Sequence, residues 1–483
     1  MYLGLDLGTS GLRGLLVSAD GHAVGDASAT YDVQYPNEGW SEQDPEDWVK
    51  ACRSVMSSLC HKYSKEYRSL KGIGVAGHMH GATCLDDAGK VIRPCILWND
   101  TRAAKEAAEL DGQPAFRAVS GNIVFPGFTA PKLLWMARHE PNNFARVAKV
   151  LLPKDYLVYW LTGELTSEMS DAAGTSWLDV GKRDWSEALI KGSGMRLDQM
   201  PTVMEGSDVV GPVRREIASE LSLLANVAVV AGAADNAAAA CGIGAFREGQ
   251  GFVSLGTSGV LLAAKDNYAP EPASAVHTFC HAVPGKWYQM GVTLSATDSL
   301  NWLAETLGTK AEDLAKNLPD SVTGPSSVRF LPYLSGERTP HNDAAARGAF
   351  IGLSKASNAE SLCQAVMEGV GFALRDCLEA LKSTGTDLPS VLAIGGGSSS
   401  PFWLQTLANI LNIPLHLPAK GDFGAALGAA RLAMLGVSGR LSAEVMVQPS
   451  IQQSFEPDPH FTAAYDAAYL KYTKSYSALK ELM

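Results

Sequence analysis

A short glycine-rich segment occurs twice in this chain and constrains its fold more than any other feature. Leu7-Gly8-Thr9-Ser10-Gly11 returns as Leu255-Gly256-Thr257-Ser258-Gly259, about half of the 483-residue chain later. Apolar runs precede and follow both copies, and an apolar run that ends at a glycine turn is typical of a buried strand. Glycine permits the positive φ of a tight hairpin. The half-chain spacing therefore predicts a duplicated strand–turn–strand unit rather than a short-period repeat.

The two copies differ at the residue that ends the first strand. Asp6 stands before the first turn, where the second copy has Ser254. Backbone N–H groups and hydroxyls at such a turn form an anion-binding concavity, and a neighbouring carboxylate can hold a divalent cation. We expect Asp6 to anchor Mg²⁺ and the two turns to contact nucleotide phosphates; the turn residues concerned are Gly8, Thr9, Ser10, Gly256, Thr257 and Ser258. A single Gly-Thr-Ser-Gly would be more typical of an ordinary hairpin, but the repetition favours the phosphate interpretation.

Composition and charge exclude several classes of protein. The length fits two domains, and the net charge of −11 argues against nucleic acid or an anionic membrane as a partner. The first residues contain no basic segment followed by a long apolar one, so no secretory signal is expected. Eight cysteines are scattered without a Cys-x-x-Cys pair. Together these features predict a cytoplasmic chain with buried thiols.

Residues 227–246 are mostly Ala, Val and Gly and have the length of a membrane span. Asp235 and Asn236 lie in the middle of this run, which makes a spanning helix unfavourable. We predict instead a buried strand over residues 227–231, a small-residue loop, and a helix that begins at Ala237 and is capped by Asp235 and Asn236. The carboxylate of Asp235, at the end of a strand and beside small residues that let a ligand approach, is a candidate general base for phosphoryl transfer to an alcohol.

Polar residues also follow two apolar runs in the first half of the chain. The glycine-containing run at residues 72–77 ends in His78-Met79-His80, and another run ends in Trp98-Asn99-Asp100. Open α/β sheets place ligands at such strand ends. A neutral imidazole can bond a hydroxylated ligand, and Trp98 can offer an apolar face to a sugar ring. The alternatives are shared zinc ligation by His78 and His80, placed on one face of a strand, and structural roles such as a turn or helix cap at Asn99-Asp100.

Two longer segments resemble the signatures of the FGGY carbohydrate kinases, within the superfamily that includes actin, sugar kinases and heat-shock chaperones. Residues 127–139 are similar to the first signature, and residues 348–353, continuing to Glu368, are similar to the second. The resemblance implies an α/β fold of two duplicated actin-like, ribonuclease H-like domains with a cleft between them. The expected domains are residues 1–243, with the sugar site and the base, and residues 244–483, with the nucleotide site.

The resemblance also implies roles for individual residues. Met79 and His80 match a sugar-binding pair, Asp235 the catalytic base and Asn236 its substrate-binding neighbour, with Trp98, Asn99 and Asp100 as further expected sugar contacts. Arg13 matches a phosphate-contacting arginine, although an ordinary surface cation is an equal alternative. Thr297 and Asn301 match adenine or ribose contacts, and Gly396 and Gly397 belong to an adenosine motif. Asp6 and Asp235 are the expected Mg²⁺ ligands.

The resulting expectation is ATP-dependent phosphorylation of a primary hydroxyl on a ketopentose. The stretches at residues 77–83, 98–100, 170–175 and 334–341 are most similar to family members that phosphorylate D-xylulose at O5. Family members for ribulose, other pentuloses, gluconate or glycerol share the fold and stay open as alternatives. An actin-like or chaperone-like ATPase and a sugar sensor without catalysis are less favoured. A homodimer is an open expectation.

Overall fold

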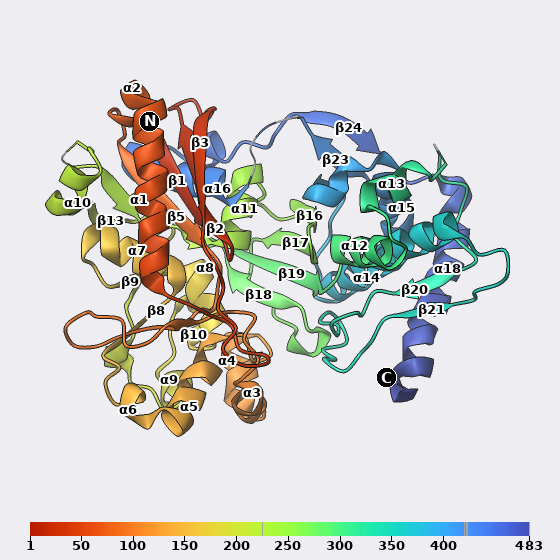
Figure 1. Ribbon diagram of the computed structural model, residues 1–483, viewed down its shortest axis with the longest axis horizontal. Helices are drawn as coiled ribbons and strands as arrows, with labels where there is room; N and C mark the ends of the chain where they lie inside the picture. Colours follow the sequence, from red (N-terminus) through yellow and green to blue (C-terminus); the bar gives the residue numbers. More distant parts are fainter. Residues whose placement is uncertain (225, 320, 420, 422–423, 483) are drawn as a thin grey trace.

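The chain folds into two α/β lobes, each built on a seven-stranded mixed sheet (Figure 1). The computed structural model describes residues 1–224, 226–319, 321–419, 421 and 424–482. The first sheet contains β13 (Val209–Pro212), β14 (Ala228–Val230), β5 (Gly72–Gly77), β1 (Tyr2–Leu7), β2 (Gly11–Val17) and β3 (Ala23–Thr30) in that order, with β15 (Ala233–Ala234) also paired to β5. The second contains β18 (His277–Cys280), β19 (Trp287–Thr293), β17 (Gly259–Lys265), β16 (Gly251–Leu255), β22 (Val391–Ile394), β23 (Leu415–Pro418) and β24 (Ile451–Phe455).

The two sheets repeat one pairing pattern. β1 pairs with β2 and β2 with β3 in antiparallel fashion, while β5 lies parallel to β1 and to β14. In the second sheet β16 pairs antiparallel with β17 and β17 with β19, while β22 lies parallel to β16 and to β23. Each series ends in an antiparallel strand, β13 or β24. The predicted duplication is confirmed as a duplicated topology, and the two glycine turns occupy equivalent places in it.

Helices flank both sheets and connect their strands. In the first lobe they are α1 (Pro45–Lys62), α2 (Ser64–Tyr67), α3 (Ala104–Asp111), α4 (Pro114–Ser120), α5 (Thr129–His139), α6 (Pro141–Phe144), α7 (Pro153–Thr162), α8 (Met169–Ala172), α9 (Glu187–Gly192), α10 (Arg215–Glu220) and α11 (Asp235–Ile243). Later in the chain are α12 (Thr297–Thr306), α13 (Ala311–Lys316), α14 (Ala359–Ser383), α15 (Pro401–Leu411), α16 (Ala425–Ser438), α17 (Ser442–Val445) and α18 (Pro459–Leu479).

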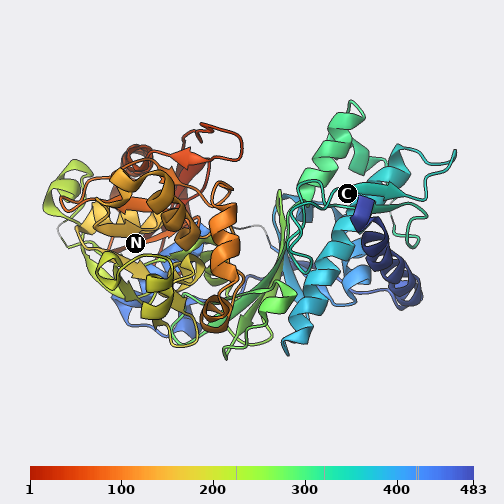
Figure 2. The same ribbon diagram turned by 90° about the horizontal axis from the view of Figure 1, so that it is seen from below.

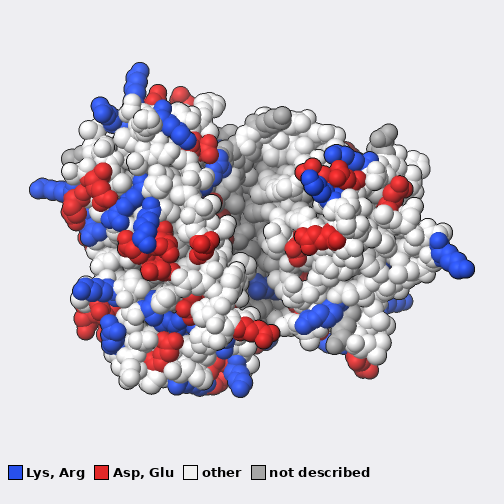
Figure 3. Space-filling view, in the orientation of Figure 1, with Lys and Arg blue, Asp and Glu red and all other residues white. Residues whose placement is uncertain are grey.

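Short two-stranded sheets, parallel or antiparallel, lie outside the two main sheets. They are β4 (Glu42–Gln43) with β7 (Cys95–Ile96), β6 (Thr83–Leu85) with β8 (Lys149–Leu151), β9 (Thr166–Glu168) with β12 (Thr202–Met204), β10 (Leu178–Asp179) with β11 (Asp184–Trp185), and β20 (Arg329–Leu331) with β21 (Ala349–Ile351). In the view from below the lobes remain separate bodies joined at a narrower waist (Figure 2). The surface is hollowed into a groove between them (Figure 3).

Helix α16 comes from the last eighth of the sequence but lies in the first lobe. It packs against β1, β5 and α11, and its blue ribbon runs beside the red strands (Figure 1). Gly4 and Gly74 permit this approach, because a Cβ atom built on Gly4 would lie 1.7 Å from the carbonyl oxygen of Ala426 and one on Gly74 would lie 2.0 Å from that of Ala429. The residues of α11 and α16 that face each other belong to one apolar cluster that also includes Phe252 and Leu392 of the second sheet. The domain boundary between residues 243 and 244 stays a prediction. Division of the sequence at this one point assigns α16 to the second domain, although the helix lies in the first lobe.

Within the described part of the chain, no helix combines the length and the apolar character that crossing a membrane requires. The alanine-rich run at residues 227–246 forms β14, β15 and the nine-residue helix α11, which is buried between the lobes. The prediction that this run is not a membrane span is therefore confirmed.

Candidate active site

Two acids selected from the sequence lie at the same edge of the first sheet. Asp6 of β1 and Ala233 of β15 both align with Ala76 of the strand between them, β5. Asp235 follows β15 directly, as the first residue of α11. Neighbouring strands lie about 4.8 Å apart, so the backbones of Asp6 and Ala233 are separated by about 10 Å across β5, and Asp235 lies two residues beyond Ala233. The sheet thus brings together two carboxylates that are far apart in sequence.

The side chains of Tyr31 and Gln43 hold the first glycine turn. Gly8 N donates to Gly11 O over 2.9 Å and closes the predicted hairpin. Tyr31 Oη donates to Gly8 O (2.6 Å), and Gln43 Nε2 donates to Thr9 O (2.6 Å). The amide of Gln43 is itself oriented by Trp48, whose Nε1 donates to Gln43 Oε1 over 3.0 Å. The turn is therefore rigid before any ligand binds, which reduces the entropy lost on binding.

Trp98 contacts this turn as well. Its indole Nε1 donates to Thr9 Oγ1 over 3.0 Å, and the ring is 42% exposed. Because the hydroxyl of Thr9 accepts this hydrogen bond, its own proton is free to be donated to another acceptor. Trp98, expected as a sugar contact, thus also connects the first turn to the loop that follows β7.

Arg13 lies directly across the hairpin from Asp6, since the two residues are register partners in β1 and β2. Its guanidinium also forms a 3.4 Å ion pair with Asp26, and the two side chains are 40% and 51% exposed. An ion pair this exposed contributes little to stability. The position agrees with a phosphate contact beside Asp6, and the role itself stays a prediction.

Asp235 is half-buried at the N-terminus of α11. Its Oδ1 accepts hydrogen bonds from the N (2.6 Å) and the Nδ2 (3.0 Å) of Asn236. Burial raises the pKa of Asp235 to about 6, although the hydrogen bonds from Asn236 oppose this shift. The predicted helix start at Ala237 was two residues late, because Ala234 is the N-cap and Asp235 and Asn236 form the first turn.

A buried charge cluster supports the segment before Asp235. Lys154 Nζ lies 2.5 Å from Asp155 Oδ1, 3.9 Å from Glu168 Oε1 and 4.0 Å from Asp171 Oδ2, and all four side chains are at most 1% exposed. Glu168 Oε1 accepts from the N of Ala234 over 3.1 Å. Asp171 belongs to the stretch at residues 170–175 that resembles the family, whereas Glu168 lies in no recognisable motif. The cluster positions the strand that carries the proposed base.

His80 is held in one tautomer and one orientation. Its backbone has φ +71°, its Nδ1 lies 2.7 Å from Gly174 O, and its ring stacks on Phe128 with centroids 4.4 Å apart. Burial lowers the pKa of His80 to about 3, so the imidazole is neutral. Because Nδ1 must carry the proton to donate to a carbonyl oxygen, Nε2 is left as an acceptor for a hydroxyl group. Met79 is 4% exposed beside it.

The expectation that His78 and His80 share one strand face was wrong. β5 ends at Gly77, and His78 packs edge-on against Trp48 at a ring-centroid distance of 5.8 Å. Among the residues that the structure describes, no group of three or more His, Cys, Asp or Glu side chains forms a metal site. The zinc alternative therefore has no structural support.

Asn99 and Asp100 differ in environment. Asn99 is exposed, whereas Asp100 is 1% exposed and its two carboxylate oxygens accept from Arg102 Nε (2.9 and 3.0 Å) and Nη2 (2.7 Å). Oδ2 of Asp100 also accepts from Ser41 N over 2.6 Å. This geometry suits a residue that shapes the loop, and sugar contact by Asp100 stays a prediction.

The predicted adenosine-side residues gather in the second lobe. Thr297 donates from N (2.9 Å) and from Oγ1 (2.7 Å) to Gly256 O, which joins the N-terminus of α12 to the second glycine turn. Thr297, Asn301, Gly396 and Gly397 line a cavity of about 290 Å³ together with Trp403 and Glu312. A Cβ atom on Gly397 would lie 2.8 Å from Leu255 Cβ, so glycine permits the close approach there. The four adenosine-side residues therefore lie at one site, next to the second turn.

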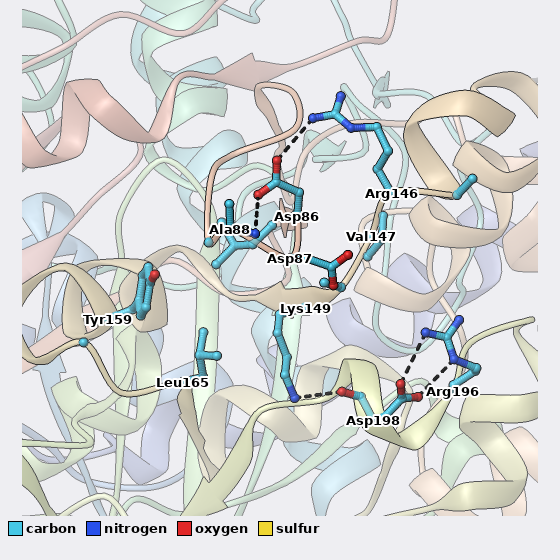
Figure 4. Close-up of a pocket in the computed structure, with 15 residues that line it drawn as sticks. Asp86, Asp87, Ala88, Arg146, Val147, Lys149, Tyr159, Leu165, Arg196 and Asp198 are labelled. Atoms are coloured by element: carbon cyan, nitrogen blue, oxygen red, sulfur yellow. Dashed lines mark hydrogen bonds and ion pairs between the residues drawn. The ribbon is translucent and has the colours of Figure 1, made fainter.

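A larger cavity, of about 550 Å³, lies elsewhere on the first lobe and contains none of the predicted site residues. Figure 4 shows its charged lining. Asp86 pairs with Arg146 (3.3 Å), Asp198 pairs with Arg196 (3.0 Å), and Lys149 donates to the carbonyl oxygen of Asp198 (2.7 Å). These charged groups are paired with one another, which favours a structural role for them.

Comparison with known proteins assigns both lobes to one family. Residues 1–242 match the N-terminal domain, and residues 251–437 the C-terminal domain, of the FGGY family of carbohydrate kinases. Xylulose kinase of Escherichia coli strain K12 is 45% identical over 486 residues, which covers 100% of both chains.

Two solved structures are similar along the whole chain. A xyloylose kinase from Brucella ovis is 54% identical, with a TM-score of 0.98 and coverage of 100% of both chains. Xylulose kinase from Rhodospirillum rubrum is 30% identical, with a TM-score of 0.92 and coverage of 100% of this chain and 99% of the other. The similarity therefore includes both sheets and the groove between the lobes.

Proposed function

Because this chain belongs to the FGGY family of carbohydrate kinases, we propose that it transfers the γ-phosphoryl group of ATP to O5 of D-xylulose. One observation carries the chemical part of the proposal: Asp6 and Asp235 lie at the same sheet edge on either side of β5. The choice of sugar is supported by full-length relatives named xylulose kinases. The names of the relatives indicate a substrate, and the site residues indicate how it reacts.

Asp235 is the proposed general base. A carboxylate with a pKa of about 6 is ionised at neutral pH and is a stronger base than an ordinary aspartate. It accepts the proton of the sugar hydroxyl while the hydroxyl oxygen bonds to the γ-phosphorus and ADP leaves. Asn236, fixed on Asp235, lies beside the same sugar.

His80 and Met79 form the proposed wall of the sugar site. The acceptor Nε2 of a neutral His80 suits a sugar hydroxyl as donor, and the stack on Phe128 fixes the direction of that hydrogen bond. The side chain of Met79 supplies apolar contact to the carbon chain of the sugar.

The proposed cation site contains few protein ligands. Asp6 and Asp235 are the carboxylates at the sheet edge, and Mg²⁺ is commonly held by one or two carboxylates together with substrate phosphates and water. The donor set therefore fits Mg²⁺ and not a cation that requires a complete protein cage. When bound, Mg²⁺ neutralises charge on the phosphates. The amides of the two glycine turns and Arg13 would contact the remaining phosphate oxygens.

The substrate assignment is tested by measuring ADP release with a panel of D-xylulose, D-ribulose, D-fructose, glycerol and gluconate. We expect kcat/KM to be highest for D-xylulose and ATP turnover to depend on the sugar. A tenfold preference for another member of the panel would reassign the substrate. ATP turnover that no sugar stimulates would instead favour an ATPase that only switches conformation. Cytoplasmic location and a homodimer remain proposals from the sequence.

The raised pKa of Asp235 predicts a pH dependence. The base acts only when ionised, so kcat/KM for the sugar should fall about tenfold per pH unit below about pH 6 and reach a plateau above it. The measurement is a pH profile of kcat/KM for the sugar at saturating MgATP, which reports the enzyme–MgATP complex before the sugar binds. An acid limb centred near pH 4, the ordinary value for aspartate, would contradict the assignment of Asp235.

A further inference from the structure

The loop that joins β20 to β21 carries an arginine whose backbone is held from both sides. Glu337, before it, accepts from Thr293 Oγ1 (2.7 Å) and from Leu294 N (3.1 Å). Thr339, after it, exchanges two hydrogen bonds with Val292, from Val292 N to Thr339 Oγ1 and from Thr339 N to Val292 O, each 3.0 Å long. Arg338 is therefore fixed at the end of β19, in the second lobe.

The guanidinium of Arg338 reaches residues of the first lobe. Its Cζ lies 4.8 Å from the ring centroid of Phe125, and that ring packs against Phe128 (5.5 Å) and His277 (5.2 Å). Phe128 is the residue on which His80 stacks. Burial lowers the pKa of His80, and the charges of Lys132 and Arg338 lower it further. Arg338 thus contacts, from the second lobe, the aromatic cluster on which His80 stacks.

Within the part of the chain that the structure describes, no residue forms a hydrogen bond or an ion pair with the guanidinium of Arg338. Its neighbour Glu337 uses its oxygens on Thr293, Leu294 and the backbone N of Arg338 itself. Two other buried arginines differ: Arg102 pairs with Asp100 and Glu42, and Arg431 donates to the carbonyl oxygens of Cys241, Gly242 and Val447. A half-buried charge without partners is unfavourable in the free protein. Five N–H donors remain for a ligand.

We propose that Arg338 binds the sugar from the second lobe, donating hydrogen bonds to the carbonyl oxygen O2 and the hydroxyl O1 of the ketose. This inference rests on the proposed function. Asp235 takes the proton at O5, whereas Arg338 contacts Phe125 in the aromatic cluster behind His80, so it is placed at the other end of the sugar. A guanidinium fork matches two adjacent oxygens, one of them a carbonyl. The sugar then bridges the two lobes, and selectivity for a ketose over a polyol arises at Arg338.

The test compares Arg338→Met and Arg338→Lys with Arg247→Met. Arg247 is an exposed arginine, and its guanidinium lies 5.1 Å from the Phe246 ring centroid, so the control removes the same kind of side chain and ring contact. We expect Arg338→Met to lower kcat/KM for D-xylulose by about 10²-fold or more, mainly through KM. Arg338→Lys should recover part of that loss, and the KM for MgATP should stay within about twofold of wild type.

Xylitol provides the second readout, because it carries a hydroxyl in place of the carbonyl. Xylitol is measured as a competitive inhibitor against D-xylulose. In Arg338→Met, the fold increase in its inhibition constant should be smaller than the fold increase in the KM for D-xylulose. ADP affinity equal to that of wild type shows that the variant is folded. Unchanged kcat/KM for D-xylulose in folded Arg338→Met, or a loss confined to the KM for MgATP, would overturn the inference. Wild-type protein that does not phosphorylate D-xylulose would overturn the proposed function instead.

Discussion

Replacing Asp235 by Asn is expected to lower kcat for sugar phosphorylation by about 10³-fold. The amide keeps the size of the side chain but cannot accept the proton of the sugar hydroxyl. Steady-state ADP release with D-xylulose measures the loss, and ADP affinity should stay close to that of wild type because the adenosine-side residues Thr297, Asn301, Gly396 and Gly397 lie in the second lobe. Asp198→Asn is the matched control, since the Asp198 side chain is 72% exposed and lies at the cavity of Figure 4. Near wild-type turnover in Asp235→Asn would remove Asp235 from the role of base.

The stability of the same variant separates chemistry from misfolding. The pKa of Asp235 is raised above its unfolded value by burial, so ionisation of this group becomes less favourable on folding. Its contribution to the free energy of unfolding is thus largest when it is protonated and falls as pH rises through the interval from about 4 to about 6. A neutral Asn at this position should unfold at pH 7 at a denaturant concentration equal to or above that of wild type. If Asp235→Asn were both inactive and less stable than wild type, misfolding would explain the lost activity and the result would not bear on the role of Asp235 as base.

Replacing Gly4 by Ala is expected to destabilise the protein by about 3 kcal/mol, the upper end of the range for overpacked sites. The new Cβ would lie 1.7 Å from Ala426 O and 2.7 Å from Ala430 N, which are backbone atoms of α16 and cannot rotate away. The helix must therefore move off the first sheet. Equilibrium denaturation in urea measures the change in the free energy of unfolding.

Gly211→Ala is the control for this substitution. Gly211 lies in β13 of the same sheet, and a Cβ atom built on it meets no atom within 4 Å. The free energy of unfolding should change by less than about 0.5 kcal/mol there. Equal stability of Gly4→Ala and Gly211→Ala would show that α16 can leave the sheet without loss.

Local pattern predicted much of the first sheet. Both glycine turns form the expected hairpins, and β1, β2 and β5 occupy the runs that the apolar pattern indicated. The reason is that strand direction and turn conformation depend on neighbouring residues, through alternation of side chains and the φ that glycine permits. The start of α11 was misplaced because Asp and Asn favour the N-cap in general, whereas here the N of Ala234 is bound by Glu168 from another segment.

The sequence by itself therefore determined the duplicated unit, the two turns and the acids that follow their strands, since each is encoded within about ten consecutive residues. Only the tertiary structure decided which distant segments meet. It placed α16 on the first sheet, where the helix can approach because Gly4 and Gly74 have no Cβ atom. It also brought Arg338 of the second lobe to Phe125 of the first. Contacts of this kind depend on the packing of whole helices and sheets, and no local pattern of residues specifies them.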